Sequence, residues 1–311
     1  MKNAVVCLVM LGDLYIPGAL VVAKTFKKYN KNILDNTDVV CMVTKDVTEK
    51  GRNILIKYFD KIVVVPYIEQ NTKMFSKKQN EIYKKWMNVS FTKWNCLMLT
   101  EYKKILFLDA DLLIMNNIAE LFDINTPAAI FYLDSSREMK NYIFKKYKMG
   151  EKIKNEDIEY QLENSGNVLD ASLVLLEPSV ETFKGLKKII YKNKNFYKPR
   201  NSISGPDEVC LTEYYLEHGG WHNIYWKYNI TLWKNKLPLN EIKILNFRST
   251  KPWMTDECWD DMKLWWNEAK QIENIYDFIE KKNICRGGSY LHKYLKYKKK
   301  YLHLKNIIKK N

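Results

Sequence analysis

The sequence predicts an α/β fold built on a doubly wound, mainly parallel sheet, and three observations support this. Short apolar runs rich in Val, Ile and Leu alternate with longer segments of helical periodicity in the first half of the chain. These runs are continuously apolar rather than alternating, which is typical of strands covered on both faces. The chain has 311 residues, of which 46% are hydrophobic, so it can bury a sizeable core.

The expected elements alternate along the chain. Strands are expected over residues 4–11, 38–44, 61–66, 104–109, 128–133 and 169–179. Helices are expected over residues 17–29, 47–58, 77–100 and 137–165, from about 180 to 193, and over 205–220. The last of these has Pro206 in a first-turn position and the pair Gly219–Gly220 at its end, as helix termini favour. A Trp-rich stretch, 251–266, then leads to the carboxyl-terminal tail.

Most of the positive charge lies in that tail. The chain holds 51 Lys and Arg against 36 Asp and Glu, a net charge of +15. Residues 281–311 contribute eleven basic residues and no acid, so 15 − 11 leaves +4 on residues 1–280. We therefore expect one domain over 1–280 and a basic amphipathic helical tail over 281–311. A tail of this kind suits binding to an anionic membrane surface or to a protein partner. The alternative is a solvated terminal helix that packs partly on the domain. Nucleic-acid binding is disfavoured because the body carries little of the charge.

The six cysteines indicate a reducing compartment. They are Cys7, Cys41, Cys96, Cys210, Cys258 and Cys285, with no C-x-x-C pair, and we expect reduced thiols. The apolar run that follows Lys2 lacks the cleavage site of a signal peptide. No apolar run approaches the roughly 18 residues needed to cross a bilayer. The expected location is the cytoplasm.

Two carboxylates follow the apolar strand 104–109. Asp109 and Asp111 flank the small Ala110, at the carboxyl end of a strand where open α/β sheets bind ligands. Hard divalent ions such as Mg²⁺ or Mn²⁺ take carboxylate oxygens and keep coordination sites for phosphate. The pattern therefore predicts a metal–diphosphate site. The alternative is that Asp109 caps the following turn and Asp111 is solvated.

The segment FTKWNCLMLTEYKKILFLDADLLIMNNIAELFD (91–123) resembles the glycogenin-like retaining glycosyltransferases of family 8, in particular their relatives in large insect DNA viruses. Further similar segments are VVCLVMLGDLYIPGALVVAKTFKKY (5–29), LDASLVLLEPSVETF (169–183), PDEVCLTEYY (206–215) and NFRSTKPW (246–253), so the resemblance covers most of residues 3–255. It implies a single GT-A (Rossmann-like) domain with a mixed, mainly parallel sheet. It also implies metal-dependent, retaining transfer of a hexose from a UDP-sugar to an unknown acceptor, with Mn²⁺ or Mg²⁺ as cofactor.

The resemblance also implies site residues. Tyr15 would stack on the uracil, Asp207 would lie beside the anomeric carbon, and Lys251 would neutralise the departing diphosphate. The catalytic candidates are therefore Asp207 and Lys251. The implied donor-binding residues are Val9, Met10, Leu11, Tyr15, Lys93, Asp109, Ala110, Asp111, Asp170, Ala171, Ser172 and Glu208. Four residues of the matched segments have a structural alternative. Tyr15 and Trp253 could be core aromatics, Lys93 a solvated helix lysine, and Asp207 an acid at a helix start.

Several residues depart from the family pattern. Met10, Leu11 and Gly12 stand where the family offers Thr and Asn near the base, and Asp170 and Ser172 replace an Asn and a Gly in the sugar pocket.

The metal ligands depart from the pattern too. The family's third ligand is a His upstream of the KPW segment. In this chain only Asn246 stands near that position, displaced by one residue, so the metal-ligand candidates are Asp109, Asp111 and Asn246.

The alternative functions are a catalytically impaired relative that binds a nucleotide-sugar or a partner protein, and a nucleotidyltransferase. Self-glucosylation, as in glycogenin, needs an acceptor tyrosine in the region after Tyr228. It is not expected here, since no Tyr occurs between Tyr228 and Tyr276.

Overall fold

The computed structural model describes residues 1–72, 77, 80–81, 86–131, 146–164, 168–192, 204–231, 237–248 and 250–279. The basic tail, 281–311, lies outside the described residues, as do residues 165–167. The predictions made for the tail therefore stay predictions.

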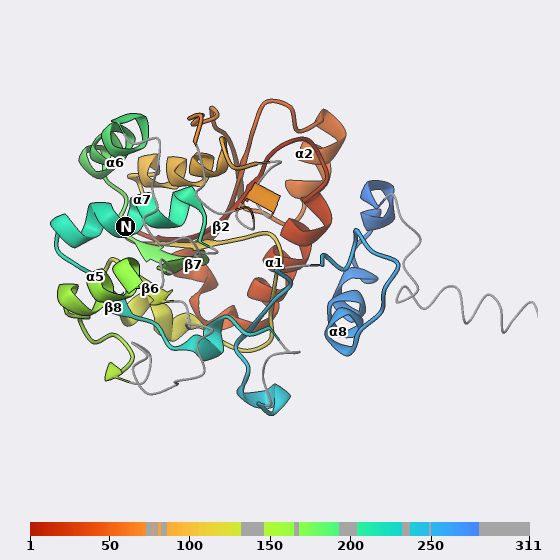
Figure 1. Cartoon of the computed structure of the whole chain (residues 1–311). Helices are drawn as coiled ribbons and strands as arrows, with labels where there is room; N and C mark the ends of the chain where they lie inside the picture. The colour runs from red at the N-terminus through yellow and green to blue at the C-terminus, as the bar shows by residue number, and fades with distance from the viewer. Residues whose placement is uncertain are drawn as a thin grey trace, which may run out of the picture.

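A seven-stranded sheet in the order β3-β2-β1-β4-β7-β6-β8 forms the centre of the molecule (Figure 1). Its strands are β1 (Asn3–Val9), β2 (Thr37–Val43), β3 (Lys61–Val64), β4 (Ile105–Leu108), β6 (Ala128–Phe131), β7 (Leu169–Leu176) and β8 (His222–Asn223). Strands β3, β2, β1 and β4 run parallel, β7 runs antiparallel to β4 and β6, and β8 is parallel to β6. The predicted mixed, mainly parallel α/β sheet is confirmed.

Helices cover both faces of this sheet, as the continuously apolar strands predict (Figure 1). In β1, Val5, Cys7 and Val9 share one core cluster with residues of α1 (Ile16–Tyr29), α2 (Glu49–Leu55) and α8 (Asp260–Ala269). Ala4 and Val6 share the other with residues of α6 (Val180–Lys192) and α7 (Pro206–Glu217). The two-residue alternation along β1 thus divides the core between the two faces.

The described residues also form one further α-helix and several 3₁₀ helices. They are α5 (Asn155–Asn164) and the 3₁₀ helices η1 (Lys31–Asn36), η2 (Ser90–Met98), η3 (Ala119–Asp123), η4 (Trp226–Tyr228), η6 (Leu239–Glu241) and η7 (Ile275–Phe278). A separate two-stranded antiparallel sheet pairs β5 (Leu112–Ile114) with β9 (Ile244–Asn246). The sequence indicated neither β5 nor β9, because three residues are too few to show a period.

Two of the expected helices differ from expectation, and one helix was not expected. The helix expected over 47–58 is α2, which begins after Thr48, whose side chain accepts a hydrogen bond from the Gly51 N–H and caps the first turn. Residues 90–98, expected to be α-helical, form the 3₁₀ helix η2. The Trp-rich stretch ends in α8, which buries Trp265 and Trp266.

One cysteine contradicts the sequence prediction. Cys7, Cys41, Cys96 and Cys210 are buried free thiols, as expected. Cys258 is disulfide-bonded, so the prediction of six reduced thiols is wrong for that residue. Spacing along the chain does not reveal which distant cysteines the fold brings together, and the redox argument for a reducing compartment loses its basis. Within the described part of the chain, every helix is too short or too polar to cross a bilayer.

Candidate functional site

The predicted acidic pair lies at a switch point of the sheet. From β1 the chain proceeds outward to β2 and then β3, and it returns to the other side of β1 as β4. The carboxyl ends of β1 and β4 therefore border a crevice of the kind in which open α/β sheets bind ligands. Met10–Gly12 follow β1, and Asp109–Ala110–Asp111 follow β4.

Gly18 in α1 allows the acidic segment to approach this helix. A Cβ atom at position 18 would lie 2.0 Å from the Ala110 carbonyl oxygen and 2.5 Å from a ring carbon of Trp253. Only glycine fits such a backbone approach. Trp253 is itself fixed, since its indole N–H donates to the Leu14 carbonyl at 2.8 Å.

Lys93 joins two of the predicted site carboxylates. Its Nζ lies 3.3 Å from Asp109 Oδ1 and 3.0 Å from Asp207 Oδ2. Lys93 is 7% exposed and Asp207 1%, so the alternative of a solvated lysine is wrong. Burial by itself would lower the pKa of Lys93, but the charges of Asp109 and Asp207 outweigh it and raise that pKa. Asp207 also lies in the first turn of α7, where an acid is favoured by the helix dipole.

The surroundings of Asp109 raise the pKa of its carboxyl group. Burial raises the pKa of its carboxyl to about 6 against the opposing charge of Lys93, and the carboxylates of Asp111 and Asp207 add to the rise. A bound cation would relieve this accumulation of negative charge.

Glu208 caps the start of α7. Its carboxylate accepts hydrogen bonds from the Gly205 N–H at 2.7 Å and from the Ala171 N–H at 3.2 Å, so it joins α7 to β7. Burial and the adjacent charge of Asp207 nevertheless raise the pKa of Glu208 to about 8.

Asp111 is paired with Lys251 across 140 residues of sequence. Lys251 Nζ donates to Asp111 Oδ2 and to the carbonyl oxygens of Phe247 and Arg248, the latter two at 2.7 and 2.8 Å. The pairing of β5 with β9 brings these segments together, and the Phe247 N–H donates to the Asp111 carbonyl at 3.0 Å. Asp111 is therefore not the solvated residue of the structural alternative.

Asp170 is the centre of a buried polar network. Asp170 Oδ1 accepts from the N–H and the hydroxyl of Ser172, at 3.1 and 2.6 Å, as in an Asx turn. Asp170 Oδ2 accepts from Arg248 and Asn229. Asn246 donates to Ser172 Oγ at 3.1 Å and to Asn229 Oδ1 at 2.7 Å.

This network connects to the acidic pair, because the Asp109 N–H donates to the Ser172 carbonyl at 2.9 Å. The sequence did not single out Asn229 and Arg248 as site residues. The only signal for Arg248 was its position within the segment 246–253.

The loop after β1 is held by two residues that the sequence did not indicate. Leu11 and Gly12 both adopt positive φ, of 59° and 79°. The Leu11 N–H donates to the Tyr67 hydroxyl at 2.9 Å, and the Gly12 N–H donates to Asp46 Oδ2 at 2.7 Å. The backbone donors of Leu11 and Gly12 are therefore already engaged. Tyr67 and Asp46 follow other strands, and no motif marks them.

The other predicted residues near this loop differ in exposure. The side chains of Val9 and Ala171 lie in the core, so contact with a ligand could come only from their backbone. Leu11 is 47% exposed and Met10 is half-buried. Tyr15 is also half-buried and meets Trp253 edge-on, with 5.8 Å between ring centroids. Burial, with the charges of Asp111 and Asp109, raises the Tyr15 pKa.

Three buried oxygens in this region accept no hydrogen bond: Asp111 Oδ1, Asp207 Oδ1 and Asn246 Oδ1. Within the described residues no three His, Cys, Asp or Glu side chains are placed to hold a metal ion together. The oxygens available are hard carboxylate and amide ligands, which suit Mg²⁺ or Mn²⁺. The residues fit a divalent ion that would take some of its ligands from a bound molecule.

Comparison with known proteins identifies relatives of this chain. The family model "Glycosyl transferase family 8" matches residues 6–166, just over half of the chain. An uncharacterized protein of Acanthamoeba polyphaga mimivirus is 30% identical over 257 residues, which cover 80% of this chain and 82% of that protein. Glycogenin of Komagataella phaffii is 25% identical over 303 residues, covering 85% of this chain. The chain spans only 64% of the length of that glycogenin.

A solved structure supports the same fold. An active-site mutant of LgtC superposes with a TM-score of 0.54 at 15% sequence identity, covering 87% of this chain and 96% of that one. The GT-A fold and the resemblance to glycogenin-like proteins, with a relative in a large virus, are thereby confirmed. The family match, the mimivirus relative and the fold agree: this chain belongs to glycosyl transferase family 8.

Proposed function

We propose that this glycosyltransferase is a retaining, metal-dependent enzyme that transfers a hexose from a UDP-sugar to an acceptor. The observation that carries the proposal is the placement of Asp109 and Asp111 at the switch point, each beside a lysine: Lys93 for Asp109 and Lys251 for Asp111. Carboxylates for a cation and ammonium groups for phosphate are the complement of a nucleoside diphosphate.

The donor is proposed to lie along the crevice from β1 to β7. The uracil would meet Met10, Leu11 and Tyr15, with the Tyr15 ring as its stacking surface. The sugar would face the buried network of Asp170 and Ser172. This order follows the sequence of elements across the sheet, because β4, with its acidic pair for the diphosphate, lies between β1 and β7.

Asp109 and Asp111 would hold Mn²⁺ or Mg²⁺, and Asn246 Oδ1 is proposed as a third, weaker ligand. When bound, the ion would supply positive charge to the diphosphate of the donor. Lys251 donates a hydrogen bond to Asp111, so its ammonium group lies where it would help the ion to neutralise the diphosphate as it departs.

Asp207 is proposed as the catalytic acidic residue beside the anomeric carbon. Its Oδ2 is held by Lys93 and its Oδ1 accepts no hydrogen bond, although the residue is buried. An unpartnered carboxylate oxygen is costly to bury. Such an oxygen can stabilise the positive charge that develops on the sugar in the transition state.

The test is a calorimetric titration of UDP with and without Mn²⁺. Two carboxylates and an amide leave most coordination positions to phosphate, so UDP affinity should rise with Mn²⁺. Asp111→Asn should remove this rise while the fold persists. Asp256→Asn, an exposed aspartate five residues after Lys251, is the matched control and should behave as the parent. An Asp111→Asn protein that retains the Mn²⁺ effect would show that the acidic pair is structural.

A second candidate is a catalytically impaired relative that binds nucleotide-sugar without turning it over. Asn246 in place of a histidine ligand favours it, because an amide binds Mn²⁺ more weakly than imidazole does. Release of UDP from a panel of UDP-sugars, with Mn²⁺ or EDTA, distinguishes the two functions. Donor hydrolysis needs no acceptor, so UDP released only with Mn²⁺ supports the enzyme. Binding without release supports the impaired relative.

A further inference from the structure

Two successive residues of the loop after β1 have left-handed backbone conformations. Leu11 has a φ of 59° and Gly12 a φ of 79°. Glycine adopts this region freely, but it is unfavourable for leucine, whose Cβ atom approaches the backbone. The Leu11 side chain is 47% exposed, so its packing contributes little that would offset this cost. The conformation of the loop therefore depends on partners of its backbone groups.

Tyr67 and Asp46 are those partners, and they are also bonded to each other. The Tyr67 hydroxyl accepts from the Leu11 N–H at 2.9 Å, and Asp46 Oδ2 accepts from the Gly12 N–H at 2.7 Å. The Tyr67 hydroxyl donates to the Asp46 carboxylate at 3.0 Å. Asp46 follows β2 and Tyr67 follows β3, so these bonds join the carboxyl ends of three neighbouring strands.

The ionised state of Asp46 fixes the direction of these hydrogen bonds. Partial burial opposes its ionisation, but hydrogen bonds from Thr44, Tyr67 and the loop backbone outweigh it and hold the pKa of the carboxyl below its usual value. A carboxylate can only accept hydrogen bonds, so the hydroxyl hydrogen of Tyr67 points to Asp46. The hydroxyl oxygen then accepts from Leu11. Both loop N–H groups are thereby held toward β2 and β3.

The carbonyl groups of the same two peptides point the other way. Both peptides are trans, and in a planar trans peptide the C=O and N–H groups point in opposite directions. The carbonyls of Met10 and Leu11 are therefore directed away from Tyr67 and Asp46. No residue in the described part of the chain donates a hydrogen bond to either oxygen. Both oxygens can accept from a ligand on the side of β1 where β4 lies.

We infer that Tyr67 and Asp46 are positioning residues that make this loop select uracil over cytosine. The inference rests on the proposed function, in which the uracil meets Met10 and Leu11. Uracil carries an N–H at ring position 3, whereas cytosine carries an unprotonated nitrogen there. Carbonyl oxygens of the loop can accept from the uracil N–H, but they would face the lone pair of the cytosine nitrogen.

The experiment is a calorimetric titration of the full chain with UDP, CDP and inorganic diphosphate, each with Mn²⁺. The parent should bind UDP at least about tenfold more tightly than CDP. Tyr67→Phe removes the hydroxyl that holds Leu11, so UDP affinity should fall about fivefold to tenfold and the preference over CDP should fall with it. Inorganic diphosphate has no base, so its affinity should not change. This readout separates a misplaced loop from a general loss of folding.

Two further variants complete the experiment. Tyr58→Phe is the matched control, because Tyr58 is also half-buried and takes no part in these hydrogen bonds. It should bind all three probes as the parent does. Asp46→Ala, at an exposed position, removes the acceptor of the Gly12 N–H and should lower the preference for UDP while the fold persists.

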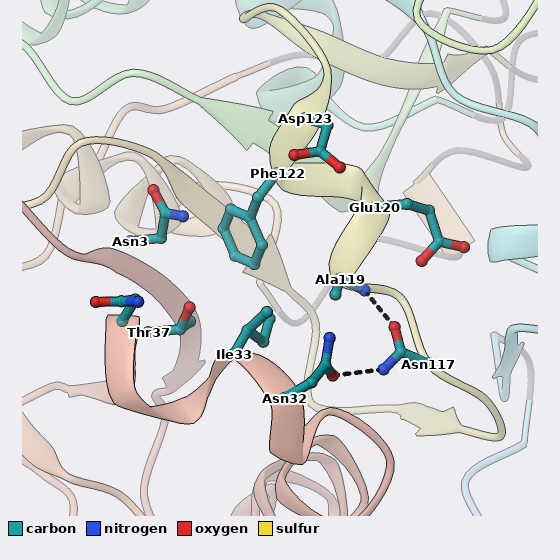
Figure 2. A pocket seen from close by; sticks show the side chains of 10 residues that line it. Asn3, Asn32, Ile33, Thr37, Asn117, Ala119, Glu120, Phe122 and Asp123 are labelled. Atoms are coloured by element: carbon teal, nitrogen blue, oxygen red, sulfur yellow. Dashed lines mark hydrogen bonds between the residues drawn. The ribbon is translucent and has the colours of Figure 1, made fainter.

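A cavity at the other end of the same strands offers an alternative place for a nucleotide. It has a volume of about 430 Å³ and is lined at the amino ends of β1 and β2 by Asn3 and Thr37, among others (Figure 2). UDP bound there would not depend on the loop at the carboxyl ends. A preference for UDP that both Tyr67→Phe and Asp46→Ala retain would therefore overturn the inference.

The diphosphate probe distinguishes failure of this inference from failure of the proposed function. If the parent binds inorganic diphosphate with Mn²⁺ but binds UDP and CDP equally, the metal–diphosphate site stands and the inference is wrong. If the parent binds neither inorganic diphosphate nor UDP, the proposed function is wrong, and the inference falls with it.

Discussion

Lys93 and Asp207 form a buried ion pair, with 3.0 Å between Nζ and Oδ2, although they come from 3₁₀ helix η2 and helix α7, 114 positions apart (207 − 93). The same ammonium group lies 3.3 Å from Asp109 after β4. One lysine therefore connects the proposed catalytic carboxylate with the proposed metal ligand.

Asp207→Asn should lower turnover much more than UDP binding. The residue is proposed to stabilise charge on the sugar and not to touch the nucleotide, so we expect a loss of about a hundredfold in kcat and less than about a threefold change in the Kd for UDP. Asparagine preserves the volume, and Lys93 retains Asp109 as a partner. Steady-state kinetics and calorimetry measure the two quantities. Equal losses in both would indicate that Asp207 mainly holds the start of α7.

Glu208 should make stability depend on pH. Its pKa of about 8 in the folded chain exceeds the ordinary value of 4.5, so it takes up a proton on folding. Its stabilising contribution is then complete below about pH 4.5 and is lost as the pH rises through about 8. Glu208→Gln should remove this decline, as followed by urea unfolding at pH 5, 6.5 and 8.

The pH slope is the readout for Glu208→Gln, because glutamine turns one accepting oxygen into a donor and costs a hydrogen bond at every pH. Glu159→Gln, at an exposed position, is the matched control and should keep the slope of the parent. Parallel slopes for Glu208→Gln and the parent would contradict the raised pKa.

Gly18→Ala should strongly destabilise the chain. The added methyl group would meet the Ala110 carbonyl at 2.0 Å and Trp253 at 2.5 Å, and a backbone oxygen cannot move aside cheaply. We expect a loss of about 3 kcal/mol or more in the free energy of unfolding, and weaker Mn²⁺-dependent UDP binding, since the acidic segment must shift.

Gly12→Ala provides the contrast for Gly18→Ala. Nothing lies within 4 Å of a Cβ at position 12, but φ is 79°. It should therefore cost only the backbone strain, about 1–2 kcal/mol. Thermal or urea unfolding compares the two variants. Equal losses would show that steric contact at Gly18 is relieved elsewhere.

Asn246→His should strengthen Mn²⁺ binding if position 246 faces the metal. Imidazole is a stronger ligand for Mn²⁺ than an amide oxygen. The larger ring must replace the hydrogen bonds to Ser172 and Asn229, so a loss of stability of about 1–3 kcal/mol is also expected. The Mn²⁺ concentration that half-saturates UDP binding is measured for the parent, Asn246→His and Asn246→Ala. If it is the same in all three proteins, Asn246 is not a metal ligand.

The sequence by itself predicted six of the seven strands of the central sheet, all but β8, and the position of the acidic pair after β4. Continuous apolar runs specify strands that are buried on both faces, and each run is long enough to show its pattern. Asp109 and Asp111 were identifiable because a strand end places them at the ligand-binding edge whatever the rest of the chain does. Glycosyl transferase family 8 was recognisable from the segment 91–123 because the residues that carry the resemblance are contiguous.

Only the tertiary structure decided which residues meet around that pair. Arg248 and Asn229 reach Asp170 because β9 pairs with β5 and brings residues 246–251 to the acidic segment, and three-residue strands leave no period in the sequence. Tyr67 and Asp46 hold the loop after β1 by hydrogen bonds between segments that follow different strands. Such contacts depend on how elements pack and not on residue spacing, so no local pattern encodes them.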